Sequence, residues 1–148
     1  MKSELSILAV VAAAALPSWG CGGASDGPER QPVAGRVSFD GKPLERGLIT
    51  FQPVDDKLPV VSAVVEGGEF ALPKSEGPAA GPHKVSVWAR KATGKKVKDP
   101  DNTGLLVEEH RELIPEQYNL RTTLTAEVPP GGEKALAFEL KPGRPARR

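Results

Sequence analysis

The chain has 148 residues, a formal net charge of +1 and a single cysteine. Its length suggests one domain, and the balanced charge gives no reason to expect nucleic acid as a partner. One cysteine excludes an internal disulfide and a multi-cysteine zinc site. Glycine (16) and proline (15) fall between short alternating apolar runs, a pattern typical of strands joined by turns.

The N-terminus has the pattern of an export signal. Lys2 precedes an apolar run from Leu5 to Leu16, and Pro17 follows it. The run is shorter than the ~20 residues that a helix needs to cross a bilayer. We therefore predict a signal peptide over residues 1–20 and an exported protein of the cell envelope.

The end of this signal resembles the lipobox of bacterial lipoproteins, in which a small residue precedes a lipidated cysteine. Gly20 and Cys21 match that pattern, whereas Ser18 and Trp19 depart from it. The resemblance implies that Cys21 is lipidated and anchors the protein to a membrane, on the periplasmic face or at the cell surface. The alternative is cleavage after residues 13–15, which would release a soluble protein.

The rest of the chain divides by composition into three parts. Residues 21–31 hold the lipidated cysteine and a polar, flexible linker. Residues 32–141 contain the alternating runs and form the predicted domain. Residues 142–148 include three arginines and are expected to be a basic, disordered tail.

Seven runs with apolar residues at alternate positions predict strands. They span residues 33–39, 48–52, 60–66, 69–72, 83–90, 122–128 and 134–140. The third run is apolar at neighbouring positions, so we expect both of its faces to be buried, and Gly67-Gly68 predicts a tight hairpin after it. A weak helical pattern covers residues 105–113. Together the strands predict an all-β, seven-stranded Greek-key β-sandwich.

Several segments resemble carboxypeptidase-regulatory-like and transthyretin-like domains. Residues 33–44 (VAGRVSFDGKPL) resemble the opening of that family, and residues 68–70 and 81–87 fit later motifs. Residues 113–118 (LIPEQY) resemble a segment of small bacterial lipoproteins of this type. The resemblance covers residues 32–140 and implies a prealbumin-like sandwich that serves as a non-catalytic module. Fold alone does not fix the function of such a domain.

The sequence shows no catalytic set, so we predict no enzyme, no cofactor and no metal. Hydroxyisourate hydrolases of the transthyretin-like fold carry an N-terminal His and a C-terminal Tyr-Arg-Gly-Ser, and neither is present. We expect His83 at the surface and His110 on a solvated, charged face. The alternative is a small hydrolase or a metal-binding module that uses the loop of residues 91–121. Glu108, Glu109 and His110 are the hydrolase candidates, and residues 99–104 are a candidate calcium site.

A candidate binding surface consists of Trp88, Tyr118, Lys95 and Lys96. Trp88 falls on the polar face of its strand, where an indole can stack on a sugar or anchor a protein. The favoured alternative is that residues 91–121 fold back over Trp88, with Ile114 and Tyr118 beside it. That segment is long for a connection between adjacent strands, so it is either a packed flap or the functional loop.

Lys95 and Lys96 allow two interpretations as well. They could contact an anionic glycan or phosphate, or they could belong to a solvated loop. Taken together, the sequence predicts a non-catalytic cell-envelope lipoprotein that has a structural role or binds a protein or glycan partner.

Overall fold

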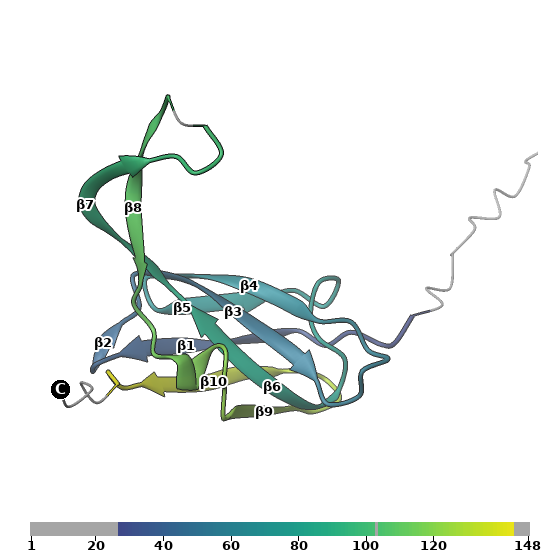
Figure 1. Ribbon diagram of the computed structural model, residues 1–148. Helices are drawn as coiled ribbons and strands as arrows, with labels where there is room; N and C mark the ends of the chain where they lie inside the picture. The colour runs from purple at the N-terminus through teal and green to yellow at the C-terminus, as the bar shows by residue number, and fades with distance from the viewer. Residues whose placement is uncertain (1–26, 103, 144–148) are drawn as a thin grey trace, which may run out of the picture.

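The computed structural model describes residues 27–102 and 104–143, and these form an all-β sandwich (Figure 1). Its elements in chain order are β1 (Val33–Phe39), β2 (Lys42–Pro43), β3 (Arg46–Pro53), β4 (Val61–Glu66), β5 (Glu69–Leu72), β6 (Gly81–Trp88), β7 (Arg90–Lys98), β8 (Leu106–Glu112), the 3₁₀ helix η1 (Glu116–Tyr118), β9 (Leu124–Val128) and β10 (Glu133–Leu140). The predicted all-β fold is confirmed.

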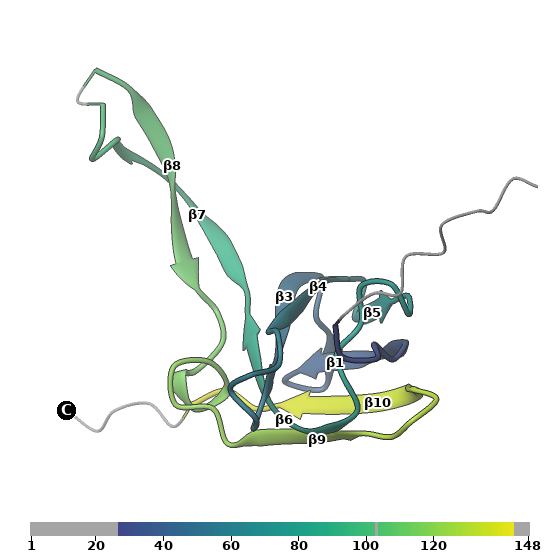
Figure 2. The ribbon, with the colours of Figure 1, turned by 90° about the vertical axis from the view of Figure 1, so that its right-hand side faces the viewer.

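The seven predicted strands correspond to the main strands of one sheet, with the order β10-β1-β5-β4-β3-β6-β9. The short strand β2 pairs with β1 at the side of this path. Strands β3, β4 and β5 follow one another, and β1 lies antiparallel beside β5. This is the predicted Greek-key arrangement. The sheet curls until its two ends approach each other (Figure 2).

The core lies inside this curled sheet. Phe51 stands 5.9 Å from Phe70 between ring centroids, and Phe70 stands 6.3 Å from Phe138. Ile49 is fully buried beside Phe51 in β3, as the alternation predicts. Each such side chain contributes about 1.5–3 kcal/mol by leaving water, so the inward faces of the strands supply most of the stabilisation.

Strand β4 differs from the sequence expectation because it is buried on one face only. Val61, Ala63 and Val65 lie in the core, whereas Val64 is 54% exposed. The sheet has one packed face at this point, so the outward valine remains in solvent. The continuous apolar run therefore marks an uncovered apolar position rather than a strand buried on both sides.

The pairing of β1 with β10 is parallel and brings the two ends of the domain together. Gly35 makes this approach possible. A Cβ atom at Gly35 would lie 2.2 Å from the carbonyl oxygen of Leu136 in β10, closer than any real carbon–oxygen contact. The glycine of the VAGRV motif therefore serves strand packing.

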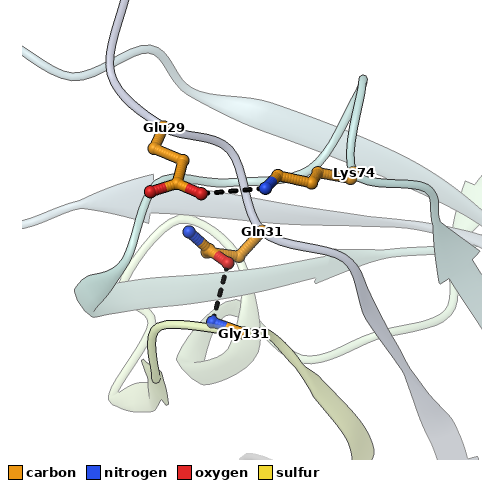
Figure 3. A network of polar contacts seen from close by, with 4 residues as sticks. All are labelled: Glu29, Gln31, Lys74 and Gly131. Carbon is orange, nitrogen blue, oxygen red and sulfur yellow. Dashed lines mark hydrogen bonds and ion pairs between the residues drawn. The ribbon is translucent and has the colours of Figure 1, made fainter.

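The last residues of the predicted linker contact the domain (Figure 3). Gln31 is buried, its Oε1 accepts a hydrogen bond of 2.8 Å from the backbone N–H of Gly131, and its own N–H donates to Pro78. Lys74 Nζ lies 2.8 Å from Glu29 Oε1. The chain is therefore attached to the sandwich from Glu29 onward, three residues before the predicted boundary at residue 32. Residues 1–26 and 144–148, which include the predicted signal peptide, Cys21 and most of the predicted tail, lie outside the described residues.

The Glu29–Lys74 pair is exposed at the surface. The hydrogen bond and the charge of Lys74 lower the pKa of the Glu29 carboxyl below its ordinary value. A carboxyl whose pKa is lower in the folded than in the unfolded chain stabilises the fold at pH values above the unfolded-state pKa. This stabilisation is lost as the pH falls through the folded-state pKa. The contact is therefore present at neutral pH and weakens in acid.

The prediction for His83 is wrong, because its side chain is buried and only 1% exposed. It shares its face of β6 with Val85 and Val87, and its ring meets Phe51 edge-on at 6.3 Å. Its Nδ1 lies 2.9 Å from the carbonyl oxygen of Gly81. Among the described residues, His83 Nε2 is a buried side-chain atom with no hydrogen-bond partner. The side chain of His83 is buried because it occupies an inward-facing position of the strand, even though its ring is polar.

The burial of His83 predicts effects of different size for two substitutions. His83→Ala should lower the free energy of unfolding by about 2 kcal/mol or more, because it leaves a cavity. His83→Leu should stay within about 1 kcal/mol of the native protein, because it removes an unpartnered polar atom while it keeps apolar volume. Urea unfolding measures both. A surface histidine would give changes within about 0.5 kcal/mol for both variants.

The segment from Arg90 to Glu112 forms a long hairpin that leaves the sandwich (Figures 1 and 2). Strands β7 and β8 pair with each other in a separate two-stranded sheet. The helix suggested by the weak pattern of residues 105–113 is therefore wrong, because β8 occupies most of these residues. Within the described part of the chain, no helix is long and apolar enough to cross a membrane.

Candidate functional site

The connection between sandwich and hairpin is fixed by backbone hydrogen bonds at Ala89, the one residue between β6 and β7. Ala89 is buried, and its carbonyl oxygen accepts a hydrogen bond of 2.7 Å from Leu113 N. Its N–H donates to Glu112 Oε1 at 2.9 Å, and Ile114 N donates to the same oxygen at 3.3 Å. We call these four residues the joint. It fastens the end of β8 to the start of β7.

Beyond the joint the chain returns to the core. Ile114 is buried in the core cluster, and Asn119 is also buried. The Asn119 Nδ2 donates a hydrogen bond of 3.1 Å to the carbonyl oxygen of Ile114. These contacts hold both ends of the hairpin against the sandwich.

A cleft of about 660 Å³ lies where the hairpin leaves the outer face of the sheet. Eight residues line it: Arg46, Gly47, Leu48, Val64, Trp88, Ala89, Arg90 and His110. They come from β3, β4, β6, the joint, β7 and β8. The outer face of the sheet therefore forms the floor of the cleft, and the base of the hairpin forms its wall.

The floor of the cleft is an apolar row across three strands. Leu48 in β3 lies directly opposite Val64 in β4 and opposite Trp88 in β6. Neighbouring strands are ~4.8 Å apart, so the three side chains form a continuous surface. Leu48 is 41% exposed and Val64 54% exposed. Apolar side chains that stay together in solvent mark a surface suited to a partner.

The rim of the cleft is positively charged. It carries Arg46 and Arg90, and none of the eight lining residues is acidic. Within residues 27–102 and 104–143, neither arginine forms an ion pair. Glu112, opposite Arg90 in the hairpin register, directs a carboxylate oxygen to the joint. Glu66 lies opposite Arg46 in the β3–β4 register, but the two form no ion pair within the described residues. Both guanidinium groups can therefore pair with an incoming acidic group.

The structure separates the residues of the predicted binding surface. Trp88 is half-buried in the cleft, whereas Tyr118 packs against the core and its hydroxyl accepts a hydrogen bond from Lys141 N. Lys95 and Lys96 are exposed on β7, beyond the residues that line the cleft. Cys21 lies outside the described residues.

The neighbours expected for Trp88 also differ. Ile114 belongs to the core cluster, on the opposite side of the sheet from the Trp88 side chain. His110 of β8 and Arg90 of β7 line the cleft with Trp88 instead. Of residues 91–121, His110 lines the cleft beside the indole, whereas Ile114 and Tyr118 pack against the core. The segment therefore does not cover Trp88 as a packed flap.

The three residues of the hydrolase alternative do not converge. His110 and Glu108 lie two positions apart on one face of β8, and both are exposed, as was expected for His110. Glu109 points to the other face, where it accepts a hydrogen bond of 2.6 Å from Thr93 Oγ1. In the described part of the chain, no three His, Cys, Asp or Glu side chains are placed to hold a metal ion.

Sequence reasoning missed Arg46, Leu48, Val64 and Arg90. A signal for two of them was present in the pattern. Leu48 and Val64 are apolar residues at outward positions of predicted strands, beside the polar Thr50 and Ser62. Their proximity to Trp88 depends on the order of strands in the sheet, which alternation alone does not give.

The chain was compared with protein-family models, curated proteins and solved structures. No protein-family model matches the chain. No curated protein matches it either. Among solved structures, the chain is similar to a DUF3823 family protein from Parabacteroides merdae, with 19% sequence identity and a TM-score of 0.39. The similarity covers 79% of this chain and 48% of the other, so this chain spans about half the length of that protein.

The joint predicts that Glu112 matters more than its neighbours on β8. Glu112→Ala should lower the free energy of unfolding by about 2 kcal/mol, because two backbone N–H groups lose a charged acceptor. Hydrogen exchange at the amides of Ala89 and Ile114 should become faster. Glu108→Ala, at an exposed position of the same strand, should change stability by less than about 0.5 kcal/mol. Equal effects of the two substitutions would contradict the role of the joint.

Proposed function

We propose that this protein is a non-catalytic lipoprotein of the cell envelope, anchored through Cys21, whose sandwich presents the β7–β8 hairpin and its cleft to a macromolecular partner. The observation that carries the proposal is the cleft itself. It combines an exposed apolar row, a half-buried indole and two arginines that form no ion pair with the described part of the chain. Trp and Arg are the side chains that contribute most at binding surfaces.

The hairpin supports the same proposal. Val97, Leu105, Leu106 and Val107 near its tip are all exposed, with Leu106 at 63%. A two-stranded hairpin has little stability alone, and this one keeps apolar side chains in solvent away from the core. A partner that covers them would explain this arrangement.

The fold and the N-terminal resemblances are consistent with this role. Carboxypeptidase-regulatory-like domains, which residues 33–44 resemble, are usually non-catalytic modules. A lipidated Cys21 with two or more acyl chains would hold the module at a membrane, since each buried CH₂ contributes ~0.8 kcal/mol. The role is then to position a binding surface at that membrane.

Photo-crosslinking in intact cells tests the binding role. A photoreactive amino acid at Leu106 should give a discrete adduct, whereas one at Val54, which is 62% exposed and outside the cleft and hairpin, should not. Trp88→Ala should remove the adduct from Leu106. Equal labelling at both positions, or no labelling at either, would refute the proposal.

The anchor has an independent test. Intact-mass measurement of the membrane fraction should show a chain that begins at Cys21 and carries acyl groups. Cys21→Ser should leave the protein unprocessed and without acyl mass. A Cys21→Ser variant that is still processed and remains in the membrane would show that the anchor is assigned wrongly.

A further inference from the structure

The chemistry of the cleft restricts which partner it fits. Its polar side chains are Arg46, Arg90 and His110, and the rest of the lining is apolar or glycine. Arginine donates hydrogen bonds and accepts none. The His110 Nδ1 lies 2.9 Å from the carbonyl oxygen of Glu108, which leaves Nε2 as the one side-chain nitrogen that can accept. The occupant must therefore be rich in acceptors and negatively charged.

This composition is unfavourable for a sugar. Each sugar hydroxyl both donates and accepts hydrogen bonds, so a site for it needs carboxylate or amide oxygens, as well as an aromatic face. The cleft lining has no Asp, Glu, Asn or Gln side chain. An apolar row flanked by arginines suits a carboxylate-bearing protein segment that also offers an apolar side chain.

The surface continues beyond the cleft along the hairpin. Leu106, Glu108 and His110 occupy alternate positions of β8 and share one face. Lys96 and Lys98 oppose Glu108 and Leu106 on that face. Seven residues of β8 span ~23 Å, longer than a small ligand and comparable to an extended peptide.

We propose that the cleft binds an acidic segment of another protein, which seats an apolar side chain on Leu48, Val64 and Trp88 and places carboxylates against Arg46 and Arg90. This inference rests on the proposed binding function. It adds that the partner is a protein segment and that the partner carries the negative charge. The guanidinium groups would form paired hydrogen bonds with the carboxylates.

The test uses the processed protein that begins at Cys21, purified in detergent. Trp19 lies in the segment that processing removes, so Trp88 is the remaining tryptophan. Its fluorescence reports on titration with short synthetic peptides that carry a leucine or phenylalanine flanked by glutamates. The same peptides with lysine in place of glutamate are the charge control. We expect saturable binding of the acidic peptides that weakens as salt is added, and no binding of the basic ones.

Charge reversal then locates the site. Arg46→Glu and Arg90→Glu should each weaken peptide binding about tenfold or more, the equivalent of about 1.4 kcal/mol. Arg111→Glu is the matched control, because Arg111 is exposed on the other face of the hairpin and outside the cleft. It should leave binding within about twofold. The thermal midpoint of each variant shows that the fold is retained.

Three results would overturn the inference: equal binding of acidic and basic peptides, equal effects of Arg46→Glu and Arg111→Glu, or binding of polygalacturonate in place of the peptides. The last result would assign the cleft to an acidic glycan. If crosslinking at Leu106 succeeds while no acidic peptide binds, the binding function stands and the acidic-segment inference fails. If neither is seen, both fail.

Discussion

The joint at Ala89 is the constraint on which the functional geometry depends. A buried backbone N–H must have a partner, and here that partner is a carboxylate from the far end of the hairpin. Because Glu112 also accepts from Ile114 N, one side chain links the start of β7, the end of β8 and the return to the core. The angle between hairpin and sheet, and so the shape of the cleft, follows from these contacts.

The cleft is a consequence of strand order as well as of the joint. Strand β3 lies between β4 and β6, which places Leu48 between Val64 and Trp88 on the outer face. On the inner face of the same strands, Ile49, Ala63 and Val87 belong to the core. The same three strands thus support a stable interior and an apolar exterior row. Their rigidity fixes the positions of the row before any partner arrives, and such preorganisation lowers the entropic cost of binding.

The sequence predicted the sandwich well because each of its strands has one face in the core. Burial imposes a period of two, and Val33, Val37 and Phe51 make that period visible. The hairpin was not predicted because residues 90–112 face solvent on both sides, so no core selects an alternating pattern. His83 was misplaced because its polar character was weighed above its parity with Val85.

The candidate site was predicted only in part. Trp88 stood out as an indole on the polar face of a strand, and it does line the cleft. Arg90 shares that polar face by alternation, but Arg46 could not be linked to Trp88, since the two are 42 residues apart in the chain and meet through the pairing of β3 with β6. Tyr118 and the lysines were grouped with Trp88 because residues 91–121 were expected to be a flap or loop beside it. In the structure the lysines are exposed on β7 and Tyr118 packs against the core.

The contacts of residues 29–31 with the domain fix the point at which the N-terminal segment meets the sandwich. The chain joins the sandwich near the start of β6, beside Pro78 and Gly131, and the hairpin leaves from the other end of that strand, ~25 Å away (Figure 1). Eight residue steps separate Cys21 from Glu29, a reach of at most ~29 Å. Under the proposed anchoring at Cys21, this reach would keep the start of β6 within ~29 Å of the lipid surface. The cleft, at the other end of β6, would then lie on the side of the sandwich away from the membrane and open to partners in the aqueous phase.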